Sequence, residues 1–211
     1  MTDQLSPVHV QRWVHGFIDT VEEEVDHLTD LDRRSGDGDF GTNMVSALRR
    51  SREAMADADV ATAGILFQIM SETFLAHSGG TSGPLFGMWF REFGKVGMVT
   101  EAFTQEMLAE ATANGLATVT RLGSAQEGDR TMVDAIAPAD RALREAVESG
   151  SELREGLRAA ARAAHEGARH TSDLLGRRGR TSYVGEAALG SPDPGAVTIA
   201  MFYQAAQRSA D

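Results

Sequence analysis

A polar segment between residues 32 and 43 holds three carboxylates within eight residues: Asp32, Asp37 and Asp39. Glycines at 36, 38 and 41 let the backbone turn through positive φ and approach a ligand closely. Because Asp and Gly both disfavour regular structure, the segment is expected to be a loop. Crowded carboxylates repel one another at neutral pH unless a cation lies between them, and Mg²⁺ prefers such hard oxygen ligands. The segment therefore predicts a Mg²⁺ site, and an acidic, solvated loop is the alternative.

Calcium is the nearest competitor for such a loop, but its EF-hand motif does not fit. An EF-hand starting at Asp37 would need an oxygen ligand where Gly41 stands and Glu where Leu48 stands. A start at Asp32 would put Asp37 where the motif needs glycine. The sequence thus favours magnesium, with phosphate as a remaining ligand.

Composition limits the classes of function. The 211 residues are 42% apolar and 24% charged, as expected for one soluble globular domain spanning residues 1–211. There is no cysteine, which excludes disulfides and thiolate metal sites. The chain shows no signal-peptide pattern and no apolar run of about 20 residues, so a cytoplasmic location is expected. The net charge of −11 argues against binding to nucleic acid or to anionic membranes.

The charge balance also bears on phosphate chemistry, because Lys95 is the only lysine. Any phosphate must therefore be neutralised by metal ions, arginine and backbone N–H groups. The loop Gly79–Pro84 has three glycines and two hydroxyl residues and leads into an apolar helix, whose N-terminus is a generic anion site. It is not a Walker A loop, since no Gly-Lys-Ser/Thr follows. The most basic spot, residues 176–183, is expected to contact an anion rather than to be a plain solvated turn.

Apolar residues at spacings of three and four predict an all-α fold. Helices are expected at 7–28, 43–55, 60–77, 85–93, 103–122, 132–147, 151–175 and from the turn at 190–195 to about 208. Asn43 stands where a helix N-cap would be, and Pro138 should kink or divide its helix. The polar loops at 32–43, 79–84, 123–131 and 176–183 fall at alternate connections. In an up-down bundle, alternate connections lie at the same end, so these loops should converge at one rim.

Several motifs of the chain resemble those of one family, the nucleotide-binding subunit or domain of dihydroxyacetone kinases, often called DhaL. The resemblance runs through the whole chain in order. It rests on Gly36-Asp37-Gly38-Asp39-Phe40-Gly41-Thr42-Asn43-Met44, Gly79-Gly80-Thr81-Ser82-Gly83-Pro84-Leu85-Phe86-Gly87, Gly128-Asp129-Arg130-Thr131-Met132-Val133-Asp134, Gly179-Arg180-Thr181-Ser182-Tyr183-Val184-Gly185-Glu186 and Asp193-Pro194-Gly195-Ala196.

The resemblance implies a barrel of eight antiparallel helices and a phosphoryl-transfer site. Asp32, Asp37 and Asp39 would hold two Mg²⁺ ions that bridge the phosphates of ADP or ATP, and Arg180 would complete the catalytic set. The nucleotide would be bound by Phe40, Gly41, Thr42, Asn43, Gly80, Thr81, Ser82, Gly123, Met132, Arg180, Asp193, Pro194 and Gly195. Phe40 replaces a histidine that some members carry, whereas Arg130 and Val133 are interpreted as mild variants.

The resemblance also implies partners. A separate DhaK-like subunit would hold the ketose, so this chain would be one half of a kinase. The phosphate source stays open between freely exchanging ATP and a DhaM-like protein of the phosphotransferase system. The ketose, triose or tetrose, and the oligomeric state, a homodimer included, also stay open. A regulatory nucleotide-binding module without turnover is the alternative function.

Overall fold

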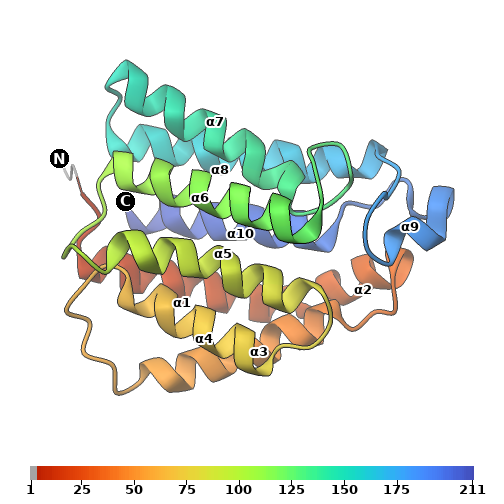
Figure 1. Cartoon of the computed structure of the whole chain (residues 1–211), viewed down its shortest axis with the longest axis horizontal. Coiled ribbons are helices and arrows are strands. Elements are labelled where there is room, and N and C mark those ends of the chain that lie inside the picture. The colour runs from red at the N-terminus through yellow and green to blue at the C-terminus, as the bar shows by residue number, and fades with distance from the viewer. Residues whose placement is uncertain (1–3) are drawn as a thin grey trace.

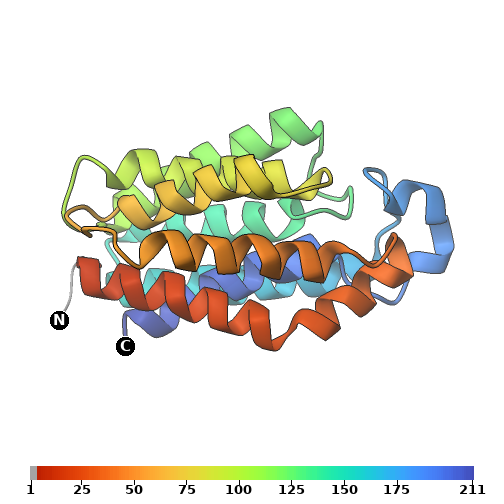
Figure 2. The ribbon, with the colours of Figure 1, turned by 90° about the horizontal axis from the view of Figure 1, so that it is seen from below.

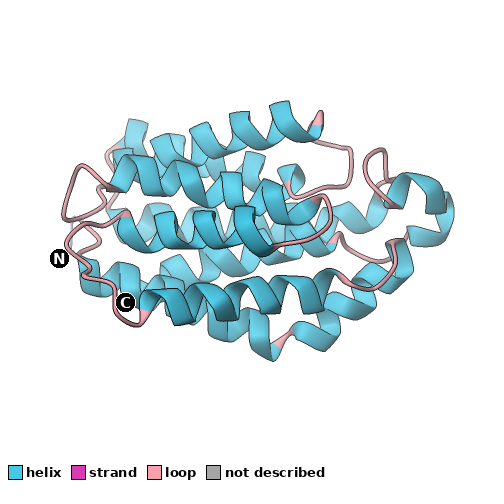
Figure 3. Ribbon diagram, turned by 60° about the horizontal axis from the view of Figure 1, so that its bottom comes forward, coloured by secondary structure: helices cyan, strands magenta, loops and turns pink. Residues whose placement is uncertain are grey.

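The computed structural model describes residues 4–211, and within that range helices joined by loops make up the fold, with no strand (Figures 1 and 3). Leu5 and Phe103 form an isolated antiparallel bridge. The helices are α1 (Pro7–Glu23), α2 (Val25–Ser35), α3 (Phe40–Met55), α4 (Ile65–His77), α5 (Ser82–Gly97), α6 (Gln105–Gly123), α7 (Val133–Ser149), α8 (Leu153–His170), α9 (Thr181–Val184) and α10 (Pro194–Ser209), with 3₁₀ turns at Thr171–Asp173 and Gly185–Ala188.

Eight long helices form a closed ring, which confirms the predicted all-α barrel. Around the ring, α1 packs on α3, α3 on α4, and so on through α5, α6, α7 and α8 to α10, which packs back on α1. Figures 1 and 2 show these helices lying along the long axis of the molecule. The short α2 extends beyond α1, and α9 lies beyond the same end of the barrel.

The ring closes around an aromatic core. Trp13 of α1 makes an edge contact with Phe67 of α4, with ring centroids 4.9 Å apart, and its indole N–H donates to the Phe202 carbonyl of α10 at 2.9 Å. Thr112 and Tyr203, both fully buried, share a hydrogen bond of 2.8 Å across the interior. These contacts join helices from both halves of the sequence, so the apolar faces predicted separately meet in one core.

Three local predictions around the acidic segment were wrong. The helix expected at 7–28 ends at Glu23, and α2 continues to Ser35. Glu24 leaves the helical conformation, with φ −97° and ψ +14°, and the chain bends there. Apolar spacing continues across the bend, so the sequence pattern does not reveal it. The acidic loop is therefore only residues 36–39, and α3 begins at Phe40. Asn43 lies inside the first turn, where its N–H donates to the Asp39 carbonyl at 3.0 Å, so it is not the N-cap.

Pro138 does not divide its helix, because α7 runs unbroken from Val133 to Ser149. A proline inside a helix leaves the carbonyl four residues earlier without its partner, here that of Asp134. Gly167 of α8 lies against this carbonyl so closely that a Cβ on it would be 2.1 Å from the oxygen. The neighbouring helix thus covers the place where the helical hydrogen bond is missing.

The two ends of the barrel differ. The loops at 36–39, 78–81, 124–132 and 174–180 lie at the end that carries α9, while the first described residues and the C-terminus lie at the other end (Figures 1 and 2). This confirms that the polar loops converge. None of the helices in the described range has the length and apolar character needed to cross a bilayer.

Candidate functional site

A cavity opens at the polar end of the barrel between the loops. Its lining comes from α2 and α3, the glycine-rich loop and α5, the end of α6, the loop before α7, the basic loop and the start of α10: Asp32, Ser35, Asp39, Phe40, Asn43, Gly79, Gly80, Thr81, Ser82, Leu85, Phe86, Val119, Gly123, Ala125, Arg130, Thr131, Met132, Arg178, Gly179, Arg180, Thr181, Asp193, Pro194 and Gly195. Segments spread over 160 residues of sequence thus form one site.

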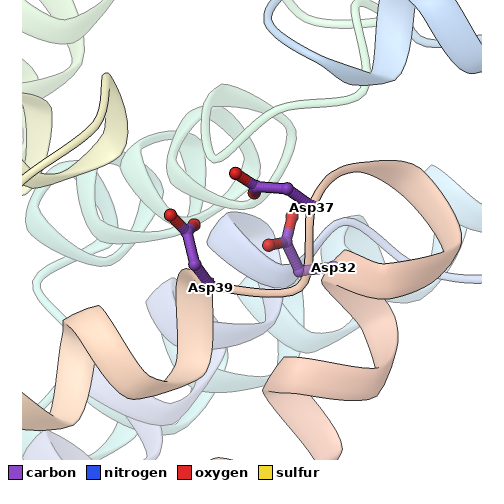
Figure 4. Close-up of side chains that lie close together, drawn as sticks. All are labelled: Asp32, Asp37 and Asp39. Carbon is purple, nitrogen blue, oxygen red and sulfur yellow. The ribbon is translucent and has the colours of Figure 1, made fainter.

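The three predicted aspartates lie close together (Figure 4), and two of them, Asp32 and Asp39, line this cavity. Asp32 comes from the last turn of α2, Asp37 from the loop and Asp39 from the N-cap position of α3. Each offers a carboxylate oxygen, and these oxygens lie within 4.8 Å of one another. Asp32 Oδ2 also accepts a hydrogen bond of 3.0 Å from the Phe40 N–H, so this carboxylate satisfies the first free donor of α3.

The triad fits a small divalent cation. Mg²⁺ binds oxygens at about 2.0–2.1 Å, so two of its ligands lie no more than about 4.2 Å apart. Small rotations of the aspartate side chains are enough to reach that spacing from the observed one. Asp37 and Asp39 are about half exposed, so such rotations meet little resistance.

Arg180 from the basic loop already contacts this triad. Its Nη1 donates to Asp37 Oδ1 and lies 3.3 Å from Asp39 Oδ1. The arginine and the aspartates are more than 140 residues apart in sequence, so their contact confirms that the basic loop and the acidic loop meet. A cation position between the carboxylates is therefore part of the fold.

The N-terminus of α5 lines another part of the cavity. Gly80 has a φ of +72°, and a Cβ on Gly83 would be 2.0 Å from Ser78 Oγ, so both glycines are needed for this tight turn. Thr81, the N-cap of α5, makes no capping hydrogen bond with its side chain. The first N–H groups of the helix and its positive dipole end therefore stay available for an anion.

The loop before α7 is held by charged side chains that face inward. Asp134 is buried and accepts hydrogen bonds from the Gly128 and Thr131 N–H groups, and burial raises the pKa of its carboxyl. Asp129 is 2% exposed and accepts from the Gln126 N–H at 3.0 Å and from Arg178 Nε at 3.2 Å. These contacts fix the loop and attach it to the basic loop.

Asp193 begins α10 and lies at the cavity. Its Oδ2 accepts a hydrogen bond of 2.8 Å from the Ala196 N–H, which caps the helix. Burial raises the pKa of the Asp193 carboxyl to about 7, against the opposing effects of the Ala196 and Gly195 N–H groups and of the charge on Arg130. The carboxyl is therefore poised between its charged and neutral forms near neutral pH.

Most of the predicted nucleotide-binding residues line the cavity, but Gly41 and Thr42 do not. Gly41 packs against α2, where a Cβ would be 2.5 Å from the Val25 carbonyl oxygen, and the Thr42 hydroxyl donates to the Asp39 carbonyl at 3.0 Å. Asp37 belongs to the carboxylate triad but is not part of the lining.

Sequence reasoning missed two groups of residues at the cavity. One is an apolar wall of Leu85, Phe86 and Val119, which periodicity assigned to the core. The other comprises Arg130, which lines the cavity, and the buried Asp129 and Asp134 of the same loop, which do not. Three charged residues within six positions of a glycine-containing loop could have indicated an internal network, but nothing local shows which way they face.

Comparison with known proteins identifies relatives of this arrangement. The family model described as the DAK2 domain matches residues 34–208. The Escherichia coli PEP-dependent dihydroxyacetone kinase, ADP-binding subunit DhaL, is 34% identical over 203 residues, which is 95% of each chain. The L-erythrulose 1-kinase of Mycolicibacterium smegmatis is 36% identical over 83% of this chain, but the match covers only 31% of that longer protein.

Two solved structures have a fold similar to that of this chain. The crystal structure of the dihydroxyacetone kinase from C. freundii in complex with AMP-PNP and Mg²⁺ matches with a TM-score of 0.72 and 31% identity, over 93% of this chain and 33% of that one. Its native form matches with a TM-score of 0.70. The predicted resemblance to the DhaL subunit is thereby confirmed. With a family model covering most of its length and a DhaL relative 34% identical over nearly all of it, this chain belongs to the DAK2 domain family.

Proposed function

We propose that this chain is the ADP- or ATP-binding subunit of a dihydroxyacetone-type kinase, which passes phosphate from Mg-nucleotide to a ketose held by a separate DhaK-like subunit. One observation carries the proposal: a carboxylate triad paired with Arg180 lies at the same cavity that an uncapped helix N-terminus lines. The names of relatives support it, since one is an ADP-binding subunit and another was crystallised with AMP-PNP and Mg²⁺.

Each wall of the cavity has a role in this proposal. Asp32, Asp37 and Asp39 hold two Mg²⁺ ions, which supply the charge neutralisation that phosphoryl transfer needs. The N–H groups at the start of α5 and the hydroxyls of Thr81 and Ser82 receive phosphate oxygens. The apolar wall of Leu85, Phe86 and Val119, together with Gly123 and Met132, accepts the base. Phe40 packs on Phe86 with ring centroids 6.3 Å apart, so it supports this wall.

In this scheme Arg180 gives up its contacts with Asp37 and Asp39 to the metal ions and turns to the phosphate that they bind. Its guanidinium already lies at the carboxylates, so it is close to the phosphate that an ion between them would bind. Its charge then meets the charge that develops on the transferring phosphoryl group. Positioning and charge therefore come from three aspartates, one arginine and backbone dipoles, which is consistent with a site that contains no lysine.

The phosphate acceptor must reach the cavity from outside. Large apolar side chains are exposed on the segments at this end, including Leu122, Leu175, Leu189 and Tyr183, the last of which is 90% exposed. We propose that a DhaK-like subunit carrying the ketose covers this rim during transfer. The ketose is either a triose or a tetrose. The phosphate comes either from ATP that exchanges freely or from a DhaM-like phosphotransferase protein that phosphorylates a bound ADP.

Nucleotide binding is tested first, by calorimetry and thermal shift with ADP in Mg²⁺ and in EDTA. Stabilisation should reach roughly 2.7 kcal/mol at a hundredfold excess over the Kd, and it should require Mg²⁺ because the aspartates repel unshielded phosphates. Equal stabilisation in EDTA, or no binding at all, would leave the triad as an acidic, solvated loop.

Transfer is tested with a DhaK-like subunit, Mg·ATP and either dihydroxyacetone or erythrulose, and in parallel with a DhaM-like phosphate donor. Formation of the phosphorylated ketose supports the proposal, and the preferred ketose and donor resolve what the sequence left open. Mg-dependent binding with no transfer under any of these conditions would favour the regulatory module.

A further inference from the structure

Arg130 is an unusual residue at the nucleotide cavity. It is 1% exposed, and it adopts a φ of +62°, which a residue with a side chain rarely does. Its Nη2 donates to two backbone carbonyls, those of Ala188 at 2.7 Å and Ser191 at 2.6 Å. The buried Nε and Nη1 have no hydrogen-bond partner among the described residues.

This arrangement is costly. Burying a guanidinium removes it from water, leaving two of its nitrogens unpaired adds to the penalty, and positive φ adds backbone strain. A buried apolar side chain would avoid the first two costs, while the backbone strain would remain. What the arginine provides in return is a connection between the loop before α7 and the segment at 188–191, which lies far away in sequence.

The connected segments carry two walls of the cavity. Two residues after Arg130 comes Met132, and two residues after Ser191 comes Asp193, which begins α10. The walls touch each other directly, since a Cβ on Gly195 would be 3.5 Å from the Met132 Cβ. The position of Met132 against Gly195 therefore depends on how the segment at 188–193 is held.

We propose that Arg130 is a positioning residue for nucleotide binding: by holding the carbonyls of Ala188 and Ser191, it fixes the α10 wall against Met132 and so preforms the cavity. Arg130 acts through these neighbours, since its own nitrogens are covered. The segment has few other anchors; the Gly190 N–H donates to the Ser172 carbonyl at 2.9 Å and the Asp193 N–H to Thr171 Oγ1 at 2.8 Å.

The test compares Arg130→Met, which keeps the bulk and removes the donors, with Arg130→Lys, which keeps a charged donor. Two readouts are needed: the Kd for Mg·ADP, and amide hydrogen exchange of the nucleotide-free protein. Arg130→Met is expected to raise the Kd at least tenfold and to speed exchange at residues 188–193. Arg130→Lys is expected to recover part of both effects, and it takes the place of Arg130→Met if that variant does not fold.

Two controls separate positioning from general loss of stability. Arg12→Met removes an exposed arginine of α1, near the opposite end of the barrel, and should change neither readout. Leu157→Ala removes a buried α8 side chain outside the cavity lining, and should lower the melting temperature with an unchanged Kd. The proposal is wrong if the Arg130 variant that folds binds Mg·ADP like wild type, or if its exchange rises evenly along the chain as in Leu157→Ala.

The Kd measurement rests on the proposed nucleotide-binding function, while the hydrogen-exchange measurement does not. If the wild-type chain fails to bind Mg·ADP, the proposed function is wrong. Hydrogen exchange in the nucleotide-free variants then still decides whether Arg130 holds the segment at 188–193.

Discussion

At the scale of single residues, the three aspartates are held differently although the sequence presents them alike. Asp32 is the one whose carboxylate bonds to the backbone, at the Phe40 N–H. Asp39 is the N-cap of α3 but makes no such bond with its side chain. We therefore expect Asp32→Ala to lower the free energy of unfolding by about 1 kcal/mol, as loss of a helix cap does, and Asp39→Ala to leave it almost unchanged. Chemical denaturation without metal measures both, and equal losses would contradict the distinction.

Arg180 occupies the cation position between two carboxylates, so a divalent ion has to displace it. Removing the arginine should let the triad bind Mn²⁺ alone a few-fold more tightly, since exposed ion pairs contribute about 1 kcal/mol or less. Arg180→Ala can be compared with Arg177→Ala, which removes an exposed charge from the same loop. Titration of Mn²⁺ without nucleotide is the measurement. Weaker ion binding by Arg180→Ala would show that the arginine assembles the triad rather than competing for it.

Asp193 should make stability depend on pH. Its pKa of about 7 in the folded chain exceeds the usual value near 3.9, so the folded state binds a proton more tightly than the unfolded state. Its contribution to stability is fully present below about pH 4 and is lost as pH rises toward 7. Asp193→Asn keeps an acceptor for the Ala196 N–H but does not titrate. The melting temperature of this variant, relative to wild type, should rise between pH 4.5 and 8, and a constant difference would refute the assignment.

At the scale of elements, the packing of α3 on α2 sets where the aspartates lie. Gly41 allows this contact, because a Cβ there would be 2.5 Å from the Val25 carbonyl and 2.9 Å from the Thr29 N–H. Gly41→Ala should therefore cost about 1–3 kcal/mol and weaken Mg·ADP binding by moving Asp39. Gly16→Ala is the matched change within α1, where a Cβ meets nothing within 4 Å. It should stabilise the chain by up to about 1 kcal/mol, and similar melting temperatures for the two variants would contradict this.

The positions of the long helices could be predicted from the sequence, but one helix end and two buried charged residues could not. Apolar spacing identifies the long helices, and alternation of the connections places the polar loops at one end. Apolar spacing does not predict that α1 ends next to Glu24, because buried Leu28 and Leu31 continue the apolar pattern after the chain has bent. Apolar spacing also does not predict the burial of Asp129 and Arg130. Their burial depends on partners at 178 and 188–191, which no local pattern can indicate.

At the scale of the whole molecule, the barrel gathers positive potential in an acidic chain. Because successive long helices alternate in direction, α3, α5, α7 and α10 all begin at the cavity, with Phe40, Ser82, Met132 and Pro194 in its lining. Each helix start carries about half a positive charge. An acidic chain with one lysine can therefore still receive phosphate, and the up-down topology is what provides the charge.

The exposed apolar rim should matter for transfer and not for nucleotide binding. Tyr183→Ser should slow phosphorylation of the ketose in the presence of a DhaK-like subunit and leave the Kd for Mg·ADP unchanged. Val99→Ser is the matched control, since Val99 is also highly exposed, at 87%, but lies just after α5, at the opposite end of the barrel. Equal transfer rates for the two variants would show that the partner does not use this rim.

The position of the chain ends has a practical consequence. The first described residues pair with Phe103, and Ala210 accepts a hydrogen bond from Arg154 at 2.7 Å, both at the end of the barrel away from the cavity. A helix of 16 residues is about 24 Å long, so this length of packed protein separates Leu5 and Ala210 from the site. The molecule can therefore be immobilised on a sensor surface, or joined to a second domain through a linker, by either end of the chain. The opening of the cavity then stays accessible to large partners.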